Sequence, residues 1–564
     1  MTKFFSLLVF GLTVVFLGCF FLWPIWQMLQ GGFINTDGRF TLGFFRLAFE
    51  NPIYVRGLLN AITFAGASTA VALLIALPLA YFADRYEFLG KRFFTGIILL
   101  PLILPPFVGA IGVQQILGTH GTLNAALIHL GWMDAAHPYD WLGHYKFLGM
   151  VILNALGLFP VLYLNLVAAL ANLDPSLEEA AGSLGCRGLR RFFKITFPLM
   201  SPGIFAGCTL AFIWSFTELG IPLIFDYNRI LPVQIYFGLK DIGNNPLPYA
   251  LTSIMLVFSV AFYAVGKILF GRHHFAMMAR ATQVSGPRRI PWWKQGGCAL
   301  LFAGVTFAAL LPHAAVVIKS FAADWYSTLL PQFWTGHNFQ IALGHPLTIP
   351  AIRNSLLYAS CATGVALLLG IAVAFVVVRT KLPGRHILDT LTMLPLAVPG
   401  LVMAFGYLSM SQRGQAFAFL NPVENPTVLL IIAYAVRKLP FMVRSAVAGL
   451  QQTSISYEEA AQSLGCPPLR ASLKITLPLV MANLTAGGLL VFSQTMLEVS
   501  DSIILAQKQQ FYPITKAIYE LLHTLADGPY LACALGVWAM LFLGITILGL
   551  SSLLGKNLGS IFRV

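Results

Sequence analysis

Residues 178–198 read EEAAGSLGCRGLRRFFKITFP, and residues 458–478 read EEAAQSLGCPPLRASLKITLP. The two copies lie 280 positions apart and align without a gap. Both are polar and basic, whereas most of the chain is apolar. A polar segment that occurs twice in an apolar chain predicts a duplicated fold, in which the same surface faces the aqueous side at two places.

The composition is that of an integral membrane protein. Of the 564 residues, 58% are hydrophobic and only 10% are charged, whereas soluble domains have about 45–50% apolar and about 25% charged residues. The apolar runs often exceed the roughly 20 residues that an α-helix needs to cross a bilayer. We therefore predict an all-α membrane protein with about twelve transmembrane helices, near residues 5–27, 57–83, 94–117, 147–171, 201–225, 249–271, 296–318, 354–378, 390–411, 427–450, 480–505 and 531–554.

Basic residues set the predicted orientation. Because Lys and Arg concentrate in cytoplasmic loops, we place both termini in the cytoplasm. Most of the 35 Lys and Arg residues then lie on that side, including Arg85, Arg379, the 267–294 cluster, Arg437 and Lys438. The net charge of +14 is thus a signal of membrane topology. Nucleic-acid binding is the weaker interpretation, because no basic segment forms a soluble domain.

The duplication extends over the whole chain. Residues 58–85 align with residues 352–379 at an offset of 294, which falls to 280 by Glu178. The first half therefore has 14 extra residues, which fall in the predicted outside loop 118–146. With six helices each, the two halves share one orientation, and we expect an axis along the membrane normal to relate them. The predicted organisation is a first repeat at 1–271, a cytoplasmic linker at 272–294 and a second repeat at 295–564.

Each copy of the duplicated segment predicts a short helix that ends at a glycine. Asp174 is a suitable N-cap with Pro175 at the first helical position, and Ser454 is the matching cap in the second copy. Gly185 and Gly465 suit the left-handed conformation that follows a helix C-terminus. Small residues between cap and glycine leave one face that a partner could approach closely, and these are Ala180, Ala181, Ala460 and Ala461.

The spacing in these loops resembles the EAA loop of ABC-importer permeases. The matching residues are Glu179, Ala180, Ala181, Gly185, Ile195 and Pro198, and again Glu459, Ala460, Ala461, Gly465, Ile475 and Pro478. The resemblance spans essentially the full length and implies the type I ABC importer permease fold. It also implies that each loop forms a coupling helix that docks on an ATPase subunit. The residues expected to couple are Glu178, Glu179, Ala180, Ala181, Gly185, Glu458, Glu459, Ala460, Ala461 and Gly465.

The same resemblance implies partners and a class of solute. The partners would be a homodimeric ATPase and a periplasmic or lipid-anchored solute-binding protein, with the chain itself in the bacterial inner membrane. Double-length permeases resemble the ferric-iron and thiamine branch, and related fused permeases are assigned to 2-aminoethylphosphonate. Ferric iron is the favoured solute, with the other two as alternatives. The chain contains no G-x-x-x-x-G-K-[ST] stretch, so we expect no ATPase site, catalytic residue or cofactor within it.

Three acidic residues lie within the predicted spans. Glu218 and Glu498 are again 280 positions apart, and Asp501 lies one helical turn beyond Glu498. Charged residues within a membrane are functional hypotheses by default, and a two-fold arrangement would place Glu218 and Glu498 on opposite sides of a central path. They either line this pathway or are tied to backbone or hydroxyl groups between packed helices. The third acid favours a cationic solute.

Two alternatives stay open at this point. Loop 118–146 holds four histidines, but their spacing matches no known metal site, so we favour a surface that contacts the binding protein. An ion-coupled secondary transporter with parallel repeats would explain twelve helices and intramembrane acids. It would not explain the two EAA loops.

Overall fold

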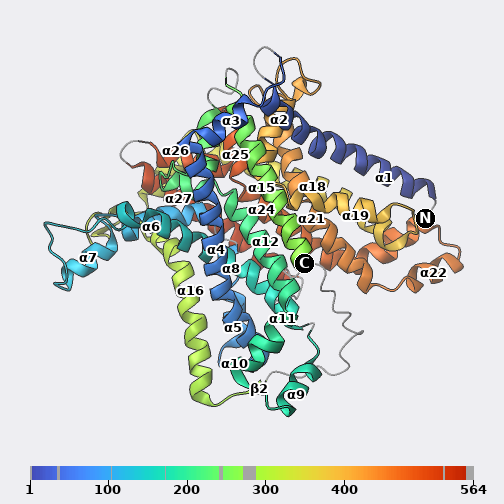
Figure 1. The fold of residues 1–564 in the computed structure, drawn as a ribbon, viewed down its shortest axis with the longest axis horizontal. Coiled ribbons are helices and arrows are strands. Elements are labelled where there is room, and N and C mark those ends of the chain that lie inside the picture. The colour runs from blue at the N-terminus through green and yellow to red at the C-terminus, as the bar shows by residue number, and fades with distance from the viewer. Residues whose placement is uncertain are drawn as a thin grey trace.

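The computed structural model describes residues 3–34, 38–102, 105–171, 173–239, 245–270, 288–524 and 527–553. The described chain is almost entirely helical, which confirms the predicted all-α class (Figure 1). It also contains two short sheets. β1 (Tyr86–Glu87) pairs in parallel with β2 (Arg288–Arg289), and β3 (Ala322–Asp324) pairs antiparallel with β4 (Phe333–Trp334). Most of the predicted linker, residues 272–287, lies outside the described residues.

The first half contains the following helices, where η marks a 3-10 or π-helical segment: α1 (Lys3–Leu17), η1 (Gly18–Leu22), α2 (Trp23–Phe33), α3 (Gly43–Glu50), α4 (Pro52–Arg85), α5 (Lys91–Ile97), η2 (Leu100–Leu102), α6 (Pro106–Leu117), α7 (Thr122–His129), α8 (Trp141–Ala171), α9 (Pro175–Ser183), α10 (Gly188–Arg191), η3 (Phe192–Thr196), α11 (Phe197–Leu199), α12 (Ser201–Phe216), α13 (Gly220–Ile224), α14 (Leu231–Gly238) and α15 (Leu247–Phe270).

The second half repeats this order with small differences: α16 (Trp292–Ser320), α17 (His337–Gly344), α18 (Thr348–Arg379), α19 (Arg385–Met393), η5 (Leu394–Leu396), α20 (Gly400–Met410), η6 (Ala418–Leu420), α21 (Thr427–Gln452), α22 (Ser456–Ser463), α23 (Pro468–Ala471), η7 (Ser472–Thr476), α24 (Leu477–Met496), α25 (Ser500–Leu505), η8 (Gln509–Phe511), α26 (Ile514–Leu522) and α27 (Gly528–Leu553).

Nine helical segments of the described chain are long and apolar enough to cross a membrane. Each coincides with one of the twelve predicted spans, although the ends differ by several residues. They are Ser6–Phe33, Pro52–Arg85, Trp141–Ala171, Ser201–Ile224, Leu247–Gly266, Trp292–Ser320, Thr348–Arg379, Pro468–Met496 and Gly528–Ile547.

The predicted spans 94–117 and 390–411 are not straight helices. In the first half, Lys91–Leu102 and Pro106–His129 meet at 95°, and in the second half Arg385–Leu396 and Gly400–Met410 meet at 99°. The prolines near the two bends have the same spacing in both halves, and in the second half Pro399 directly precedes α20. Proline removes a backbone donor, and its ring disfavours a helical residue before it. Each of these two predicted spans is therefore divided into two helices by a sharp bend.

The remaining predicted span, 427–450, corresponds to α21. This helix has 26 residues, enough to cross a bilayer. It is not among the nine apolar helices, because it carries Arg437, Lys438 and Arg444. Two of these cations are important for the site described below.

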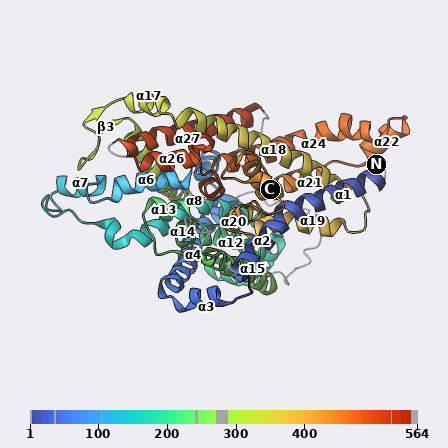
Figure 2. The ribbon, with the colours of Figure 1, turned by 90° about the horizontal axis from the view of Figure 1, so that it is seen from above.

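The first long helix of each half packs against the other half. α2 lies beside α20 (Figure 2), and Gly406 approaches so closely that an added Cβ would be 2.7 Å from the carbonyl oxygen of Pro24. The Tyr407 hydroxyl donates to the Phe20 carbonyl at 2.7 Å. In the other direction, α16 lies beside α6, where Gly112 leaves no room for a Cβ against the Pro312 carbonyl. Because the first long helix of each half packs against the other half, the two halves are joined around a shared centre.

Candidate functional site

The two duplicated loops adopt most of the predicted local structure. The Asp174 carboxylate accepts from the Ser176 amide at 2.9 Å, and α9 begins at Pro175. In the second copy the predicted cap is wrong, because α22 begins at Ser456 and Ile455 stands at the cap position without a side-chain hydrogen bond. The Ser454 hydroxyl still accepts from the Ser456 amide at 3.3 Å, one residue too early to cap the helix. Gly185 and Gly465 have φ of +79° and +86°. The expected left-handed C-termini are therefore confirmed.

One face of each loop helix is open to solvent. Glu179, Ala180, Glu459 and Ala460 are exposed, and α9 and α22 lie at two separate edges of the molecule (Figure 1). An apolar residue stands at the end of each face, because Leu184 is 88% exposed and Leu464 is 90% exposed. Sequence reasoning did not single out these leucines, although both copies share the same Ser-Leu-Gly triplet. Each loop thus presents an acid, an alanine and a protruding leucine. The second alanine of each predicted small face does not belong to it, because Ala181 is buried and Ala461 is half-buried.

The first glutamate of each loop points the other way. Glu178 and Glu458 are only 7% and 6% exposed, whereas their neighbours Glu179 and Glu459 are exposed. We had grouped all four as one kind of coupling residue. The structure separates them, because the inner pair contacts the protein itself and the outer pair faces solvent.

The contacts of the inner pair are the same in both halves. Arg85 donates to Glu178 at 2.8 Å, and the Thr196 hydroxyl donates to the same carboxylate oxygen at 2.8 Å. In the second half, Arg379 donates to Glu458 at 3.0 Å, and Thr476 donates to it at 2.8 Å. We call these two sets of three residues the Arg–Glu–Thr anchors.

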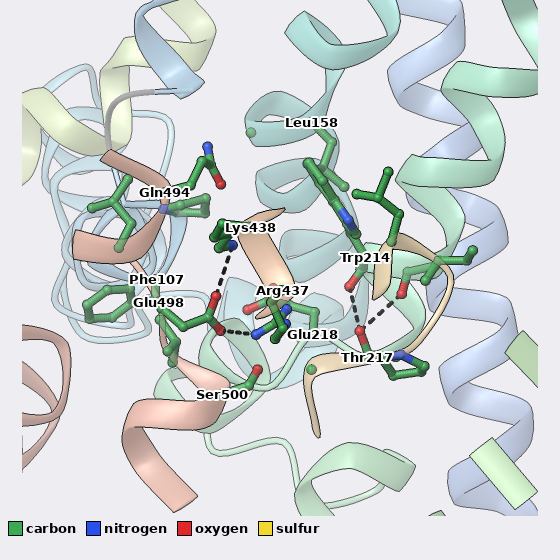
Figure 3. A pocket seen from close by; sticks show the side chains of 18 of the residues that line it. Phe107, Leu158, Trp214, Thr217, Glu218, Arg437, Lys438, Gln494, Glu498 and Ser500 are labelled. Atoms are coloured by element: carbon green, nitrogen blue, oxygen red, sulfur yellow. Dashed lines mark hydrogen bonds and ion pairs between the residues drawn. The ribbon is translucent and has the colours of Figure 1, made fainter. Parts of the chain in front are cut away.

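A cavity of about 190 Å³ lies between the two halves (Figure 3). Both halves contribute to it at equivalent positions of the repeat. Its lining includes Pro101, Pro106, Gly157, Leu158, Trp214, Thr217 and Glu218 from the first half, and Pro395, Gly400, Arg437, Lys438, Gln494, Leu497 and Glu498 from the second. Glu218 and Glu498 thus share one cavity, as a two-fold arrangement predicts. Asp501 is not among the described residues that line it.

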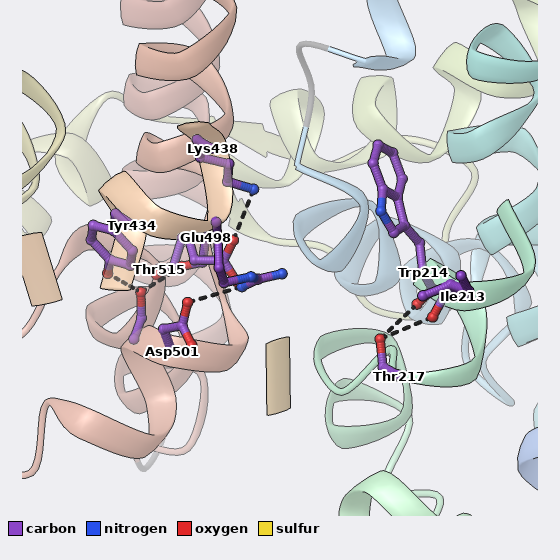
Figure 4. A network of polar contacts seen from close by, with 10 residues as sticks. Ile213, Trp214, Thr217, Tyr434, Lys438, Glu498, Asp501 and Thr515 are labelled. Carbon is purple, nitrogen blue, oxygen red and sulfur yellow. Dashed lines mark hydrogen bonds and ion pairs between the residues drawn. The ribbon is translucent and has the colours of Figure 1, made fainter. Parts of the chain in front are cut away.

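The second-half wall of the cavity is a network of opposite charges. The Glu498 carboxylate contacts Arg437 at 2.6 Å and Lys438 at 3.1 Å, and Arg437 also contacts Asp501 at 2.9 Å (Figure 4). Glu498 is 7% exposed, Lys438 is 8% exposed and Asp501 is fully buried. Two cations therefore face two carboxylates, and the network is neutral as a whole. Thr515 adds a hydrogen bond to the Glu498 backbone carbonyl at 2.8 Å.

Arg437 and Lys438 count as cytoplasmic in the predicted orientation, although they also fall within the predicted span 427–450, and the structure agrees with the span. Both lie in the middle of α21, more than three helical turns before its end at Gln452. Charges inside a membrane protein pair with one another, and these two pair with Glu498 and Asp501, a contact that neither predicted role of the acids includes. Pro440 aligns with Pro160 of α8 at the offset of 280, so the alignment carried a signal that these cations lie inside a span.

The first-half wall differs at the decisive positions. Gly157 and Leu158 stand where the second half has Arg437 and Lys438. Glu218 accepts a hydrogen bond from the Ile221 amide at 3.1 Å, and it forms no ion pair with any residue that the structure describes. Figure 3 shows the paired charges on one side of the cavity and Trp214 and Thr217 on the other. The cavity therefore has one neutral ionic wall and one wall with a lone acid.

Each wall has one glycine at this contact, but the two glycines stand at different positions of the repeat. A Cβ on Gly400 would lie 2.5 Å from the guanidinium carbon of Arg437, so the second half makes room for this side chain by lacking one at position 400. In the first half, the equivalent of Gly400 is Pro106, and a Cβ on Gly157 would lie 3.3 Å from its ring. At this contact the second-half wall therefore has the large Arg437 against a glycine, whereas the first-half wall has a glycine against Pro106.

Comparison with known proteins identifies the family. The model for the binding-protein-dependent transport system inner membrane component matches residues 72–273 and again residues 366–552. The chain belongs to this family. It is therefore a multi-pass permease of the bacterial inner membrane, with two permease repeats in one chain.

Individual relatives cover most of the permease. A ferric transport system permease of Actinobacillus pleuropneumoniae is 28% identical over 501 residues, which cover 86% of this chain and 68% of that protein. An Fe(3+)-transport system permease of Haemophilus influenzae is 25% identical over 469 residues, covering 83% of this permease and 84% of the relative. A molybdenum transport system permease of the same organism is 30% identical over 211 residues, covering 36% of this permease and 89% of the relative. The two ferric transport permeases thus match over both repeats, whereas the molybdenum permease matches little more than a third of the chain.

Proposed function

We propose that this permease supplies both halves of the transmembrane pathway of an ABC importer for ferric iron. The observation that carries the proposal is the cavity between the two repeats, to which equivalent positions of both halves contribute. The similarity to two ferric transport permeases over more than four fifths of the chain supports the choice of solute. In this proposal the repeats are residues 1–271 and 295–564, and the linker 272–294 lies in the cytoplasm with both termini.

Energy comes from a separate ATPase, which docks as two copies on α9 and α22. Their exposed faces share the acid, the alanine, the leucine and the glycine at equivalent positions, although Leu177 corresponds to Tyr457 and Gly182 to Gln462, so two identical subunits could bind them in a similar way. Glu179 and Glu459 offer a negative charge, and Leu184 and Leu464 offer an apolar contact that is almost fully exposed. Gly185 and Gly465 end these helices and fix the direction of the chain beyond them. A soluble binding protein delivers the solute on the other side of the membrane.

The cavity is the inner part of the pathway in this proposal. Glu218 and Glu498 line it from opposite halves, and Asp501 supports the wall from behind through Arg437. Because the charges of the second wall cancel, Glu218 gives the cavity a net negative charge. A negative cavity of this kind favours a cation over an anion.

The test is reconstitution of the permease with its ATPase in proteoliposomes. Radioactive ferric iron is offered on the binding protein, with ATP at the cytoplasmic face. We expect iron uptake that requires all three components. Molybdate, 2-aminoethylphosphonate and spermidine, the solutes of other relatives' families, serve as competing solutes. Uptake driven by an ion gradient without the ATPase would instead indicate a secondary transporter.

A further inference from the structure

We propose that Glu178 and Glu458 are positioning residues, which pass movement of the docked loop helix to the helices around the cavity. This inference rests on the proposed docking of an ATPase on α9 and α22. It concerns the Arg–Glu–Thr anchors, whose carboxylates face the protein and not the docking surface. The role is therefore distinct from that of the exposed Glu179 and Glu459.

Each anchor joins three elements at one carboxylate oxygen. In the first half, Glu178 belongs to α9, Arg85 is the last residue of α4, and Thr196 is the last residue of the π-helical segment η3. Hydrogen bonds to an ionised group are roughly twice as strong as neutral ones, and here both donors are buried or nearly so. A shift of α9 should therefore pull on α4 and η3 together.

From the anchor, consecutive helical segments lead to the cavity, with one turn residue, Met200, between α11 and α12 in the first half. η3 runs through α11 into α12, and Glu218 follows two residues after α12 ends. In the second half, η7 runs directly into α24, and Glu498 follows two residues after it. Both π-helical segments have five residues and occupy equivalent positions of the repeat. Single π-helical turns within helices occur frequently at functional sites.

The two anchors are not simply one copied segment. Arg85 and Arg379 are related by the offset of 294, whereas the glutamates and threonines are related by the offset of 280. The Arg–Glu contact of the first half therefore joins a residue before its 14 extra residues to a residue after them. The same contact forms in the second half, which lacks these extra residues. The second anchor has one more link, because Arg379 also donates to the Thr453 carbonyl at the end of α21 at 2.7 Å. This link connects it to the helix of Arg437.

The experiment compares two matched pairs of variants in the reconstituted importer. One is Glu178→Ala with Glu458→Ala, and the other is Glu179→Gln with Glu459→Gln. For each we measure ATPase retention in a pull-down, ATP hydrolysis, and ferric iron imported per ATP hydrolysed. The inner pair should retain the ATPase to within about twofold but import roughly tenfold less iron per ATP, because charge-assisted contacts are lost on the transmitting side. The outer-pair variant should bind less ATPase, but the complexes that form should import as much iron per ATP hydrolysed as the unaltered permease.

Two further variants protect the test against misfolding. Glu178→Gln with Glu458→Gln keeps the shape and the acceptor for threonine, and it should lower the ratio of imported iron to hydrolysed ATP less than the alanines do. Exchanging the partners, with Arg85→Glu, Glu178→Arg, Arg379→Glu and Glu458→Arg, should restore part of the ratio. An unchanged ratio in a folded inner-pair variant, or loss of docking equal to that of the outer pair, overturns the inference. Absence of iron uptake by the unaltered complex would instead contradict the proposed function.

Discussion

The two coupling loops are nearly identical, whereas the two walls of the cavity differ. α9 and α22 have the same exposed acid, alanine, leucine and left-handed glycine, and they carry the same Arg–Glu–Thr anchor. The walls have paired charges on one side and a lone Glu218 on the other. In the proposed function the loops bind two copies of one ATPase, which favours two similar surfaces. A single solute on the axis favours no such similarity, so the walls can divide their tasks.

The largest effect should come from removing the cation that holds the charged wall together. Arg437→Met leaves Glu498 with Lys438 alone and leaves the fully buried Asp501 without its partner. Breaking a buried pair in this way destabilises a protein by about 3–5 kcal/mol. Thermal unfolding of the purified permease measures this loss. The double variant with Asp501→Asn leaves Glu498 and Lys438 as a neutral pair, so it should recover much of this loss. Stability unaffected by Arg437→Met would mean that the network is not structural.

The next effect tests the symmetry of the loops. Glu179→Lys together with Glu459→Lys should abolish ATPase binding while the membrane fold persists. The reason is that charge reversal at an interface costs about 3 kcal/mol of binding free energy. Each single variant should weaken binding to a similar degree, since the two faces are alike. Pull-down from detergent solution provides the measurement. Full retention by the double variant, or a strong difference between the single variants, would contradict the comparison.

A smaller and unequal effect should distinguish the walls. Glu218→Gln removes the unpaired charge, so ferric iron uptake should fall roughly tenfold with little change in stability. Glu498→Gln removes one of two acids that balance Arg437 and Lys438, so it should cost about 1–3 kcal/mol of stability. Uptake and thermal unfolding are measured on both variants. If the two substitutions gave the same pattern, the walls would not have separate roles.

The smallest effect concerns the two glycines of the cavity walls. Gly400→Ala places a methyl group against the Arg437 guanidinium and should destabilise the permease by about 1–3 kcal/mol. Gly157→Ala meets only the edge of the Pro106 ring, at 3.3 Å, and should cost less than about 1 kcal/mol. Unfolding temperatures of the two variants decide this. Equal losses would show that the space beside Arg437 is not needed for its position.

Local sequence determined the parts of this permease that depend on neighbouring residues. Caps, prolines and glycines fix where α9 begins and where its C-terminus turns, because their effects act within one or two turns. Apolar runs fixed the position of most membrane helices, because a bilayer requires a certain length. The internal repeat paired Glu218 with Glu498 without any knowledge of the fold.

Tertiary structure decided what these residues contact. Glu178 and Glu179 are adjacent in sequence, yet one is buried beside Arg85 and the other faces solvent, because contacts across 93 positions set the orientation of α9. The sequence places the cations at 437 and 438 within a span but gives no partner for them, and Arg437 meets Glu498 and Asp501, more than 60 positions away. The packing of α2 and α16 against the opposite halves likewise depends on close approaches at Gly406 and Gly112. A membrane interior makes such pairing obligatory for buried charges, but only the folded chain determines which partners meet.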